Sequence, residues 1–264
     1  MDLKQFSVAY KKRSSFLARL QRACQNLLQT HSLAHDVRQY LNSRVPDLNL
    51  QEKFLFGFFP PDDQIELLFP DVSLEELLHY QIIYPHYVQN DNTRILTYKS
   101  YFHTHNLVWP YMDLYGNIVS FLGRTCITEE ERKRLGIDKY MYTKGFAKSL
   151  QVFGLYQAKK AILEKGYAIV VEGQLDCISC HFYGIENVVG LGGVTLGKYQ
   201  KHLIRRFTDK FYLCLDGDME GQKSMQNIIK RDEGIEFKTL TLPSGYKDID
   251  LYLKNTGNVQ VLNW

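Results

Sequence analysis

Short apolar runs alternate with segments of helical pattern from residue 166 onward. The runs cover residues 167–171, 187–190, 211–215 and 236–241, and the helical segments cover residues 175–183, 196–207, 219–231 and 248–254. Strands separated by helices are typical of a mostly parallel sheet, because parallel neighbours need a long crossover connection. We therefore expect an α/β domain with such a sheet over residues 166–264, and we expect the carboxyl ends of its strands along one edge.

Acidic residues follow two of the predicted strands and open the last predicted helix. Glu172 ends the first apolar run, Asp216 and Asp218 end the third, and Asp248 and Asp250 follow in Lys-Asp-Ile-Asp. Ligands bind at the carboxyl ends of strands in such sheets, so we expect these carboxylates to share one site. Mg²⁺ prefers oxygen ligands of this kind, and two ions can clamp the attacking and leaving oxygens of a displacement at phosphorus. The pattern indicates phosphoryl transfer on nucleic acid, in which Glu172 could act as the base.

Two motifs near these residues have other readings. Asp216, Asp218 and Gly221 fit the first half of a calcium-binding loop, but the twelfth position is Asn227, where a bidentate Glu is needed, and a strand precedes the loop. The Cys-x-x-Cys-His run 177–181 matches a haem-attachment pattern, but it falls where the inner face of a helix is expected. Small buried cysteines on a packing face are favoured there.

The cysteines also bear on metals and redox state. The five residues are scattered and odd in number, so we expect reduced thiols rather than a disulfide framework. A zinc site would need a second pair of Cys or His ligands at suitable spacing, and only scattered histidines are present. We therefore expect no zinc.

The first 165 residues predict a different organisation. Apolar residues at helical spacing over 6–42, with a break near 30–32, predict one or two amphipathic helices. Short helical patterns alternate with turns from Leu41 to Tyr87. Aromatic and β-branched residues over 98–124, with a turn at 115–117, predict a hairpin of strands. The predicted domains are a basic helical segment, a mixed α+β subdomain and the α/β domain, over residues 1–44, 45–165 and 166–264.

Charge and hydropathy limit the class of protein. No run approaches the ~18 apolar residues that span a bilayer, and the N-terminus does not resemble a signal peptide, so we expect a soluble cytoplasmic protein with no membrane partner. The net charge of +3 is uneven, because basic residues dominate 1–44 and 124–165 and acidic residues dominate 45–123. These blocks favour local anion-binding surfaces, although ordinary solvated helix faces explain residues 1–44 equally well.

The acidic motifs resemble those of a known domain. Their residues and order are similar to the TOPRIM domain of bacterial-type primases, topoisomerases and some nucleases: Glu172-Gly173…Asp176, Asp216-Gly217-Asp218 and Lys247-Asp248-Ile249-Asp250. Three upstream motifs resemble the region that precedes TOPRIM in DnaG-like DNA primases, and a fourth fits that family's turn after the second strand: residues 120–124, 138–140, 145–156 and 191–195. The resemblance covers residues 41–253.

The resemblance implies an RNA polymerase domain that makes short RNA primers on single-stranded DNA from ribonucleoside triphosphates. It implies two Mg²⁺ or Mn²⁺ ions held by acidic residues: Glu172, Asp176, Asp216, Asp218, Asp248 and Asp250. Glu172, Asp216 and Asp218 would be catalytic. Three basic residues match those with which the family holds nucleotide phosphates and the template backbone: Arg124, Lys139 and Lys148.

Some features depart from the family pattern. Residues 1–44 carry no Cys/His cluster like the family's zinc-binding module. We also expect the chain to lack the helical bundle and the helicase-binding domain that usually follow TOPRIM in this family. Residues 101–105 lack the arginine that the family commonly has before the strand of Pro110. A small core of this kind suits a phage or plasmid enzyme that works with a replicative helicase or a separate template-recognition protein. The basic segment 1–44 could replace the missing module by gripping single-stranded DNA or docking a helicase.

Other functions use the same acidic residues. A TOPRIM-type nuclease would activate water with them, but it would not need the lysine-rich region upstream. A topoisomerase would need longer strand-passage domains. A non-catalytic nucleic-acid-binding scaffold for replication would be free to lose Glu172, Asp216 and Asp218, all of which are present.

Overall fold

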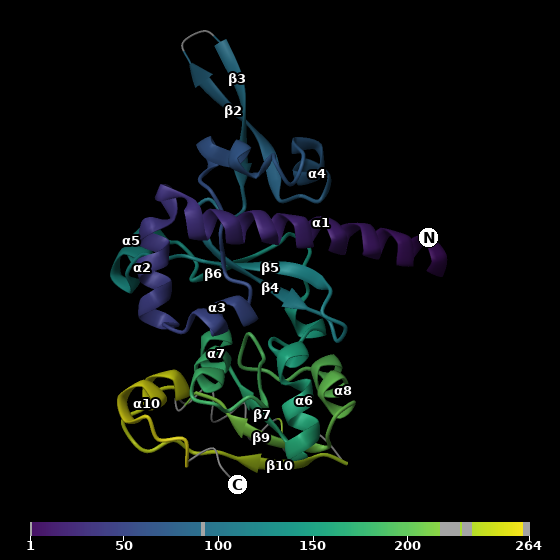
Figure 1. The fold of residues 1–264 in the computed structure, drawn as a ribbon, viewed down its shortest axis with the longest axis vertical. Coiled ribbons are helices and arrows are strands. Elements are labelled where there is room, and N and C mark those ends of the chain that lie inside the picture. Colours follow the sequence, from purple (N-terminus) through teal and green to yellow (C-terminus); the bar gives the residue numbers. More distant parts are fainter. Residues whose placement is uncertain (1, 91–92, 217–227, 229–233, 261–264) are drawn as a thin grey trace. The chain divides into compact units, whose positions relative to one another are not determined.

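The chain forms two compact units. The computed structural model describes residues 2–90, 93–216, 228 and 234–260. The first unit comprises Met1–Tyr111 and Asn117–Phe146, and the second comprises Met112–Gly116 and Ala147–Trp264 (Figure 1). The division of the chain into residues 1–44, 45–165 and 166–264 stays a prediction.

The first unit begins with two helices, as predicted. α1 spans Leu3–Thr30, a 3-10 turn η1 spans Ser32–Ala34, and α2 spans His35–Arg44. Asp2 starts α1 through a capping box with Gln5, which satisfies backbone N–H groups that have no partner inside the helix. The backbone is extended at His31, and its ring nitrogen accepts from the Leu33 N–H, so the chain turns at the predicted break.

The first unit continues with short helices and with strands that form two sheets. These elements are α3 (Leu48–Lys53), β1 (Gly57–Phe58), the 3-10 helix η2 (Asp62–Leu68), α4 (Leu74–His79), β2 (Ile83–Asn90), β3 (Thr93–Ser100), β4 (Leu107–Met112), β5 (Ile118–Arg124), α5 (Glu129–Leu135) and β6 (Tyr140–Tyr142). One sheet has the order β1-β4-β5-β6. β4 and β5 are neighbours joined across the turn at Gly116, which confirms the predicted hairpin.

α1 packs closely on the four-stranded sheet. The inner side of α1 buries Phe16, Leu17 and Leu20, and the sheet contributes Trp109 and Phe121 to the core. At β1 the approach requires glycine, because a Cβ atom at residue 57 would lie 2.7 Å from the Cβ atom of Cys24. Packing against the sheet therefore holds the second half of α1.

The region around residue 83 differs from the prediction. Short helical patterns were expected up to Tyr87, but Ile83–Asn90 is a strand that pairs with β3 in a separate two-stranded sheet. Period-2 alternation arises when one face of a strand is buried and the other is wet. Most of this ribbon is exposed on both faces, so its sequence carries no such alternation.

The second unit contains the predicted parallel sheet. Its strands are β7 (Ala168–Val171), β8 (Val188–Gly190), β9 (Lys210–Cys214) and β10 (Glu236–Thr239), in the order β10-β9-β7-β8 with every neighbouring pair parallel. The helical elements are η3 (Lys148–Leu150), α6 (Leu155–Lys165), α7 (Gln174–Phe182), α8 (Lys198–Arg205) and α10 (Ile249–Thr256). These findings confirm the α/β prediction, except that the predicted helix at 219–231 lies largely outside the described residues.

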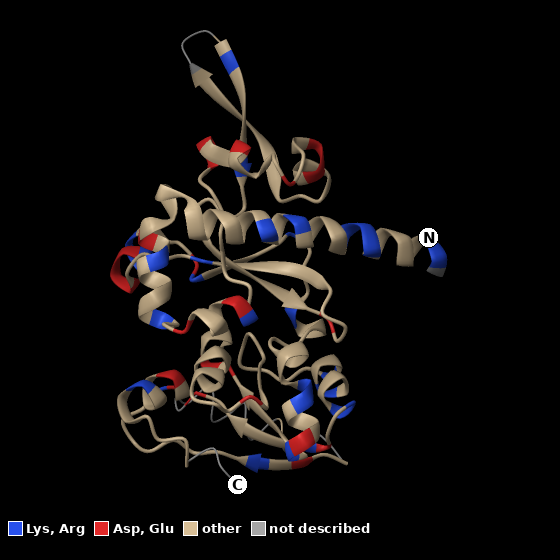
Figure 2. Ribbon diagram, in the orientation of Figure 1, with Lys and Arg blue, Asp and Glu red and all other residues tan. Residues whose placement is uncertain are grey.

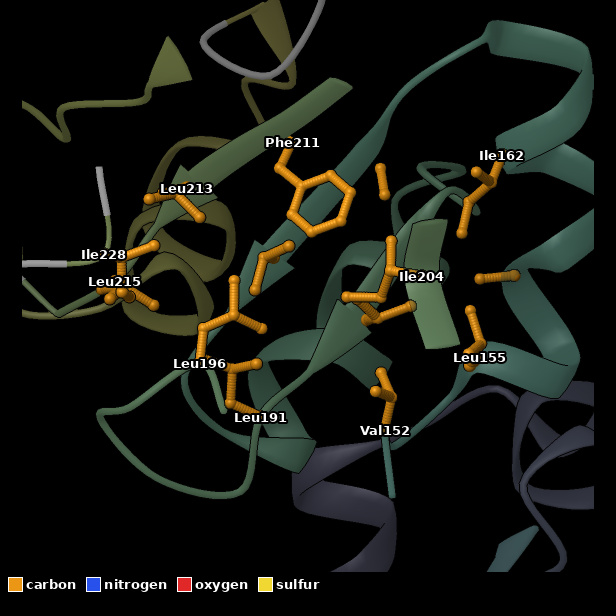
Figure 3. Close-up of a cluster of buried hydrophobic side chains, with 14 residues drawn as sticks. Val152, Leu155, Ile162, Leu191, Leu196, Ile204, Phe211, Leu213, Leu215 and Ile228 are labelled. Carbon is orange, nitrogen blue, oxygen red and sulfur yellow. The ribbon is translucent and has the colours of Figure 1, made fainter. Parts of the chain in front are cut away.

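The core of the second unit lies between the sheet and its helices. α6 and α8 contribute Leu155, Ile162 and Ile204, which pack against Phe211 and Leu213 of β9 (Figure 3). All four residues of β7 are buried, so both faces of the sheet are covered. Continuous apolar strands are the expected sequence pattern for a sheet buried on two sides.

The structure also shows the state of the cysteines and the character of the helices. All five cysteines are free thiols, and Cys177 and Cys180 are buried inside α7, which confirms that they pack in the core. Within the described part of the chain, the helices are too short or too polar to span a bilayer.

Candidate active site

Two acidic residues lie at the carboxyl edge of the parallel sheet. Glu172 directly follows β7, and Asp216 comes two residues after the end of β9. β7 and β9 are parallel neighbours, and Val171 pairs with Cys214 at their ends. The register therefore places both acidic residues at the same edge, as the sequence predicted. Asp218 lies outside the described residues.

A third carboxylate is fixed by the start of α7. Asp176 lies in the first turn of this helix, and its Oδ2 accepts a hydrogen bond of 2.9 Å from the N–H of Gly173. Negative charge is favoured at a helix N-terminus, because the first N–H groups of the helix point toward it. The short connection from β7 to α7 thus brings Asp176 to the same edge as Glu172.

The Lys-Asp-Ile-Asp motif opens α10. Asp248 is the N-cap, and its Oδ1 accepts from the N–H of Leu251 at 2.8 Å. Asp250 is buried in the first turn and forms an ion pair of 3.0 Å with Lys254, four residues later. Both carboxylates are therefore held by contacts within their own helix.

Three of the predicted acidic ligands act electrostatically on Asp176. Burial, followed by the negative charges of Asp248, Asp216 and Asp250 in that order, raises the pKa of Asp176 from its ordinary value of 3.8 to about 7. These residues come from α7, α10 and the loop after β9, which are distant in the sequence. The structure therefore brings Asp176, Asp216, Asp248 and Asp250 into one electrostatic cluster.

The cluster has the chemistry of a divalent-cation site. Its donors are hard carboxylate oxygens, and the pKa of Asp176 is raised first by burial and then by neighbouring negative charge, which a cation would neutralise. Among the described residues, His, Cys, Asp and Glu form no group of three closed around a single ion position. Mg²⁺ needs no such cage, because it usually takes one or two carboxylates and completes its shell with water and substrate phosphates.

Arg124 is held between two tyrosines in the first unit. Its Nε donates to the Tyr40 hydroxyl at 2.5 Å and its Nη1 donates to the Tyr140 hydroxyl at 2.6 Å. The guanidinium also lies 5.1 Å from the centre of the Tyr140 ring, within cation–π range. Arg124 ends β5 and is buried, so it differs from an ordinary exposed residue at a strand end.

Sequence reasoning missed both tyrosine partners of Arg124. Tyr140 stands in the motif Asp138-Lys139-Tyr140, where a polar aromatic residue beside a lysine was the available signal. Tyr40 lies 84 residues before Arg124, and no local pattern connects them.

The two predicted lysines have different surroundings. Lys139, in the first unit, places its Nζ 5.5 Å from the centre of the Tyr140 ring. Lys148, in the second unit, donates from Nζ to the Gly192 carbonyl at 2.8 Å. The Gly192 N–H donates to the carbonyl of Glu172 at 2.9 Å, so Lys148 lies at the same sheet edge as Glu172.

Comparison with known proteins identifies the family. A family model described as "Toprim-like" matches residues 169–253, and one described as "DNA primase catalytic core, N-terminal domain" matches residues 23–159. The chain belongs to the family of DNA primase catalytic cores. The predicted resemblance to DnaG-like primases and the predicted fold are therefore confirmed.

Similar proteins include bacterial DNA primases. This primase core is 30% identical to a DNA primase of Aquifex aeolicus over 247 residues, which are 92% of this chain and 47% of that protein. It is 34% identical to a DNA primase of Clostridium acetobutylicum over 153 residues, which are 57% of this chain and 25% of that protein. The primase core thus spans less than half the length of these relatives.

Solved structures give the same fold. The zinc-binding and RNA polymerase domains of the Aquifex aeolicus primase match with a TM-score of 0.75 at 29% identity, covering 99% of this chain and 62% of that one. A DnaG primase catalytic domain bound to single-stranded DNA matches with a TM-score of 0.73 at 24% identity, covering 94% of this chain and 77% of that one. At 24% identity, the similarity to the DNA-bound catalytic domain shows only that this primase core has the same fold.

Proposed function

We propose that this primase core synthesises short RNA primers on a single-stranded DNA template from ribonucleoside triphosphates. The observation that supports this proposal is the gathering of Asp216, at the end of β9, and of Asp248 and Asp250, at the start of α10, close enough to Asp176 in the first turn of α7 for their charges to act on it. A triphosphate binds such an edge only through cations, and nucleotidyl transfer uses divalent cations for that purpose. Membership of the primase family supports RNA synthesis over the nuclease and the scaffold.

Two Mg²⁺ or Mn²⁺ ions would bind at the carboxylate edge. The proposed ligands are Glu172, Asp176, Asp216, Asp218, Asp248 and Asp250. When bound, the ions supply positive charge that stabilises the attacking and leaving oxygens at phosphorus. Asp248 accepts from the Leu251 N–H through Oδ1. Both oxygens of Asp250 lie 3.0 Å from Nζ of Lys254, so a metal ion bound there would compete with this ion pair.

The chain's other residues would bind and orient the substrates. Glu172, which directly follows β7, would take the proton of an attacking 3′-hydroxyl. Lys148, which is linked through Gly192 to the backbone of Glu172, would hold triphosphate oxygens. Arg124 and Lys139 would contact phosphates of nucleotide or template.

Primer synthesis tests the proposal directly. Purified protein is incubated with single-stranded DNA, labelled ribonucleotides and Mg²⁺ or Mn²⁺, beside a double variant Asp216→Ala, Asp218→Ala. Short RNA made by the wild type and not by the variant is the expected result. Shortened DNA without RNA would instead favour the nuclease. No activity in either assay, with an added helicase or zinc-containing partner also failing to restore it, would favour the scaffold.

Replacing Arg124 with lysine is expected to raise the KM for ribonucleotides about tenfold. Lysine keeps the charge, but it cannot donate in the fixed fork that reaches both Tyr40 and Tyr140. Steady-state primer synthesis at varied nucleotide concentration measures the effect. Tyr140→Phe is the matched comparison, because it keeps the ring and removes one hydrogen bond, and it should have a smaller effect. An unchanged KM in the lysine variant would contradict the assignment.

The N-terminal helix is proposed to grip single-stranded DNA. Lys and Arg recur along α1 (Figure 2), and Lys11 and Lys12 are exposed. Replacing Lys11, Lys12 and Arg13 with glutamine is expected to weaken DNA binding and to lower the slope of log affinity against log salt by about 2, since each phosphate contact contributes about 0.7 on a single strand. Fluorescence anisotropy at several salt concentrations measures both quantities.

A control removes the same charge elsewhere. Lys133, Arg134 and Lys160 each pair with a glutamate of their own helix, so changing them to glutamine should leave the salt slope unchanged. Equal slopes for both triple variants would contradict DNA binding by α1. That result would favour its other proposed role, the docking of a replicative helicase or a template-recognition protein.

A further inference from the structure

The β2–β3 ribbon presents two different faces. Its strands pair antiparallel from Ile83 opposite Ser100 to Asn90 opposite Thr93, in a sheet of their own (Figure 1). Residues directly opposite each other point to the same face, and the faces alternate along each strand. One face, which we call the tyrosine face, is therefore formed by Pro85, Tyr87, Gln89, Arg94, Leu96 and Tyr98.

The tyrosine face is an uncovered aromatic surface with a cation on it. Tyr87 is 49% exposed, and Leu96 opposite it is 46% exposed. The guanidinium of Arg94 lies 4.0 Å from the centre of the Tyr87 ring. Tyr98 is half-buried, and Pro85 opposite it is exposed. Aromatic rings and guanidinium planes are the surfaces on which unpaired nucleobases stack.

Charge on the ribbon favours a polyanion. Among the described residues of β2 and β3, Arg94 and Lys99 are charged and there is no Asp or Glu (Figure 2). The neighbouring elements η2 and α4 are acidic, with Asp62 and Glu75 in their first turns. Asp91, in the sequence between the two strands, lies outside the described residues. On the described part of the tyrosine face, Arg94 is the charged side chain that a phosphate can contact.

The spacing of the rings favours a single strand over a duplex. Tyr87 and Tyr98 occupy diagonal positions on one face, which lie roughly 7–8 Å apart in an antiparallel pair. Bases along one strand of a duplex repeat every ~3.4 Å. Two bases can stack on the two rings only when the strand between them is unstacked, as it can be in single-stranded DNA.

We propose that the tyrosine face binds single-stranded DNA, with bases stacked on Tyr98 and on the Tyr87–Arg94 pair. Arg94 also contacts a backbone phosphate. The inference rests on the proposed function because it takes the single strand bound by the tyrosine face to be the template for primer synthesis. The ribbon adds a second contact with that strand, distinct from the carboxylate edge of the parallel sheet.

Paired substitutions on the two faces test the proposal. The full chain is titrated into a fluorescein-labelled oligo(dT) of 16 nucleotides, and binding is followed by anisotropy. The double variant Tyr87→Ala, Arg94→Ala is expected to bind about tenfold more weakly or worse. The control Val88→Ala, Ile95→Ala changes two residues of the opposite face that are equally exposed and paired, and it should bind like wild type. Tyr87→Phe keeps the ring and should retain affinity.

Other outcomes separate this inference from the proposed function. Equal affinity of wild type and the Tyr87/Arg94 variant, or the same loss in the Val88/Ile95 control, would overturn the tyrosine face as a DNA site. A changed sedimentation coefficient with unchanged DNA affinity would assign the face to a second copy of the chain and would also overturn it. Loss of DNA binding in the Tyr87/Arg94 variant, with binding retained in the Val88/Ile95 control, supports the inference. A wild-type protein that makes no RNA would count against primer synthesis, but it would not count against DNA binding by the tyrosine face.

Discussion

Replacing Asp216 with alanine is expected to reduce primer synthesis about a thousandfold or more. Asp216 follows β9, and its charge acts with burial and with the charges of Asp248 and Asp250 to raise the pKa of Asp176. A metal ion contributes several kcal/mol to stabilising the charge that develops at phosphorus, and each 1.36 kcal/mol corresponds to a tenfold change in rate. Steady-state measurement of RNA product with Mg²⁺ checks the loss.

Asp209 supplies the matched control for this experiment. It lies just before the other end of β9 and pairs at the surface with Arg205, at 2.8 Å. Exposed ion pairs contribute little to stability, so Asp209→Ala should leave both folding and synthesis nearly unchanged. Similar activity of the Asp216 and Asp209 variants would show that the carboxyl end of the strand has no special role.

Replacing Asp176 with asparagine is expected to stabilise the metal-free protein above pH 7 by about 2–4 kcal/mol. The pKa of Asp176 is about 7 in the folded protein, because burial and then the charges of Asp248, Asp216 and Asp250 oppose its ionisation. The pKa in the unfolded chain is about 3.8. Between pH 3.8 and about pH 7 the Asp176 carboxyl is therefore protonated in the folded state and ionised in the unfolded state. Wild-type stability falls as the pH rises through this range.

Urea unfolding in EDTA across pH 4–8 measures the effect of the Asp176 substitution. Asparagine keeps an oxygen that can accept from the Gly173 N–H, so the start of α7 is preserved. The variant should match wild type near pH 4 and exceed it increasingly up to pH 7, where the difference levels off. Saturating Mg²⁺ should reduce the advantage, because the cation neutralises the same charge. A difference in unfolding free energy between variant and wild type that stays constant with pH would mean that the pKa of Asp176 is not raised in the folded protein.

The fold of the second unit could be predicted because its strands are buried on both faces. Such strands are continuous apolar runs, and helices between them dictate parallel pairing. Acidic residues that end these runs, such as Glu172 and Asp216, are then placed by topology alone. The position of Asp176 follows from the short connection between β7 and α7, whereas its high pKa depends on burial that the sequence does not display.

Other features depend on long-range contacts that leave no local pattern. The β2–β3 ribbon escaped prediction because neither of its faces is buried along most of its length. Arg124 was predicted from its motif, but its partner Tyr40 comes from a helix far away in the sequence. The contact of Lys148 with Gly192 likewise joins the first residue of η3 to a loop 44 residues later. Charge and spacing identify such residues as candidates, and tertiary packing decides what they touch.

The most direct test of the carboxylate site is anomalous diffraction from crystals soaked with Mn²⁺ and a non-hydrolysable ribonucleoside triphosphate. A manganese peak is expected at the carboxyl edge of the parallel sheet, among Asp176, Asp216 and the first turn of α10, with triphosphate oxygens completing its shell. Triphosphate bound elsewhere, or no metal at this edge at concentrations that support synthesis, would contradict the account.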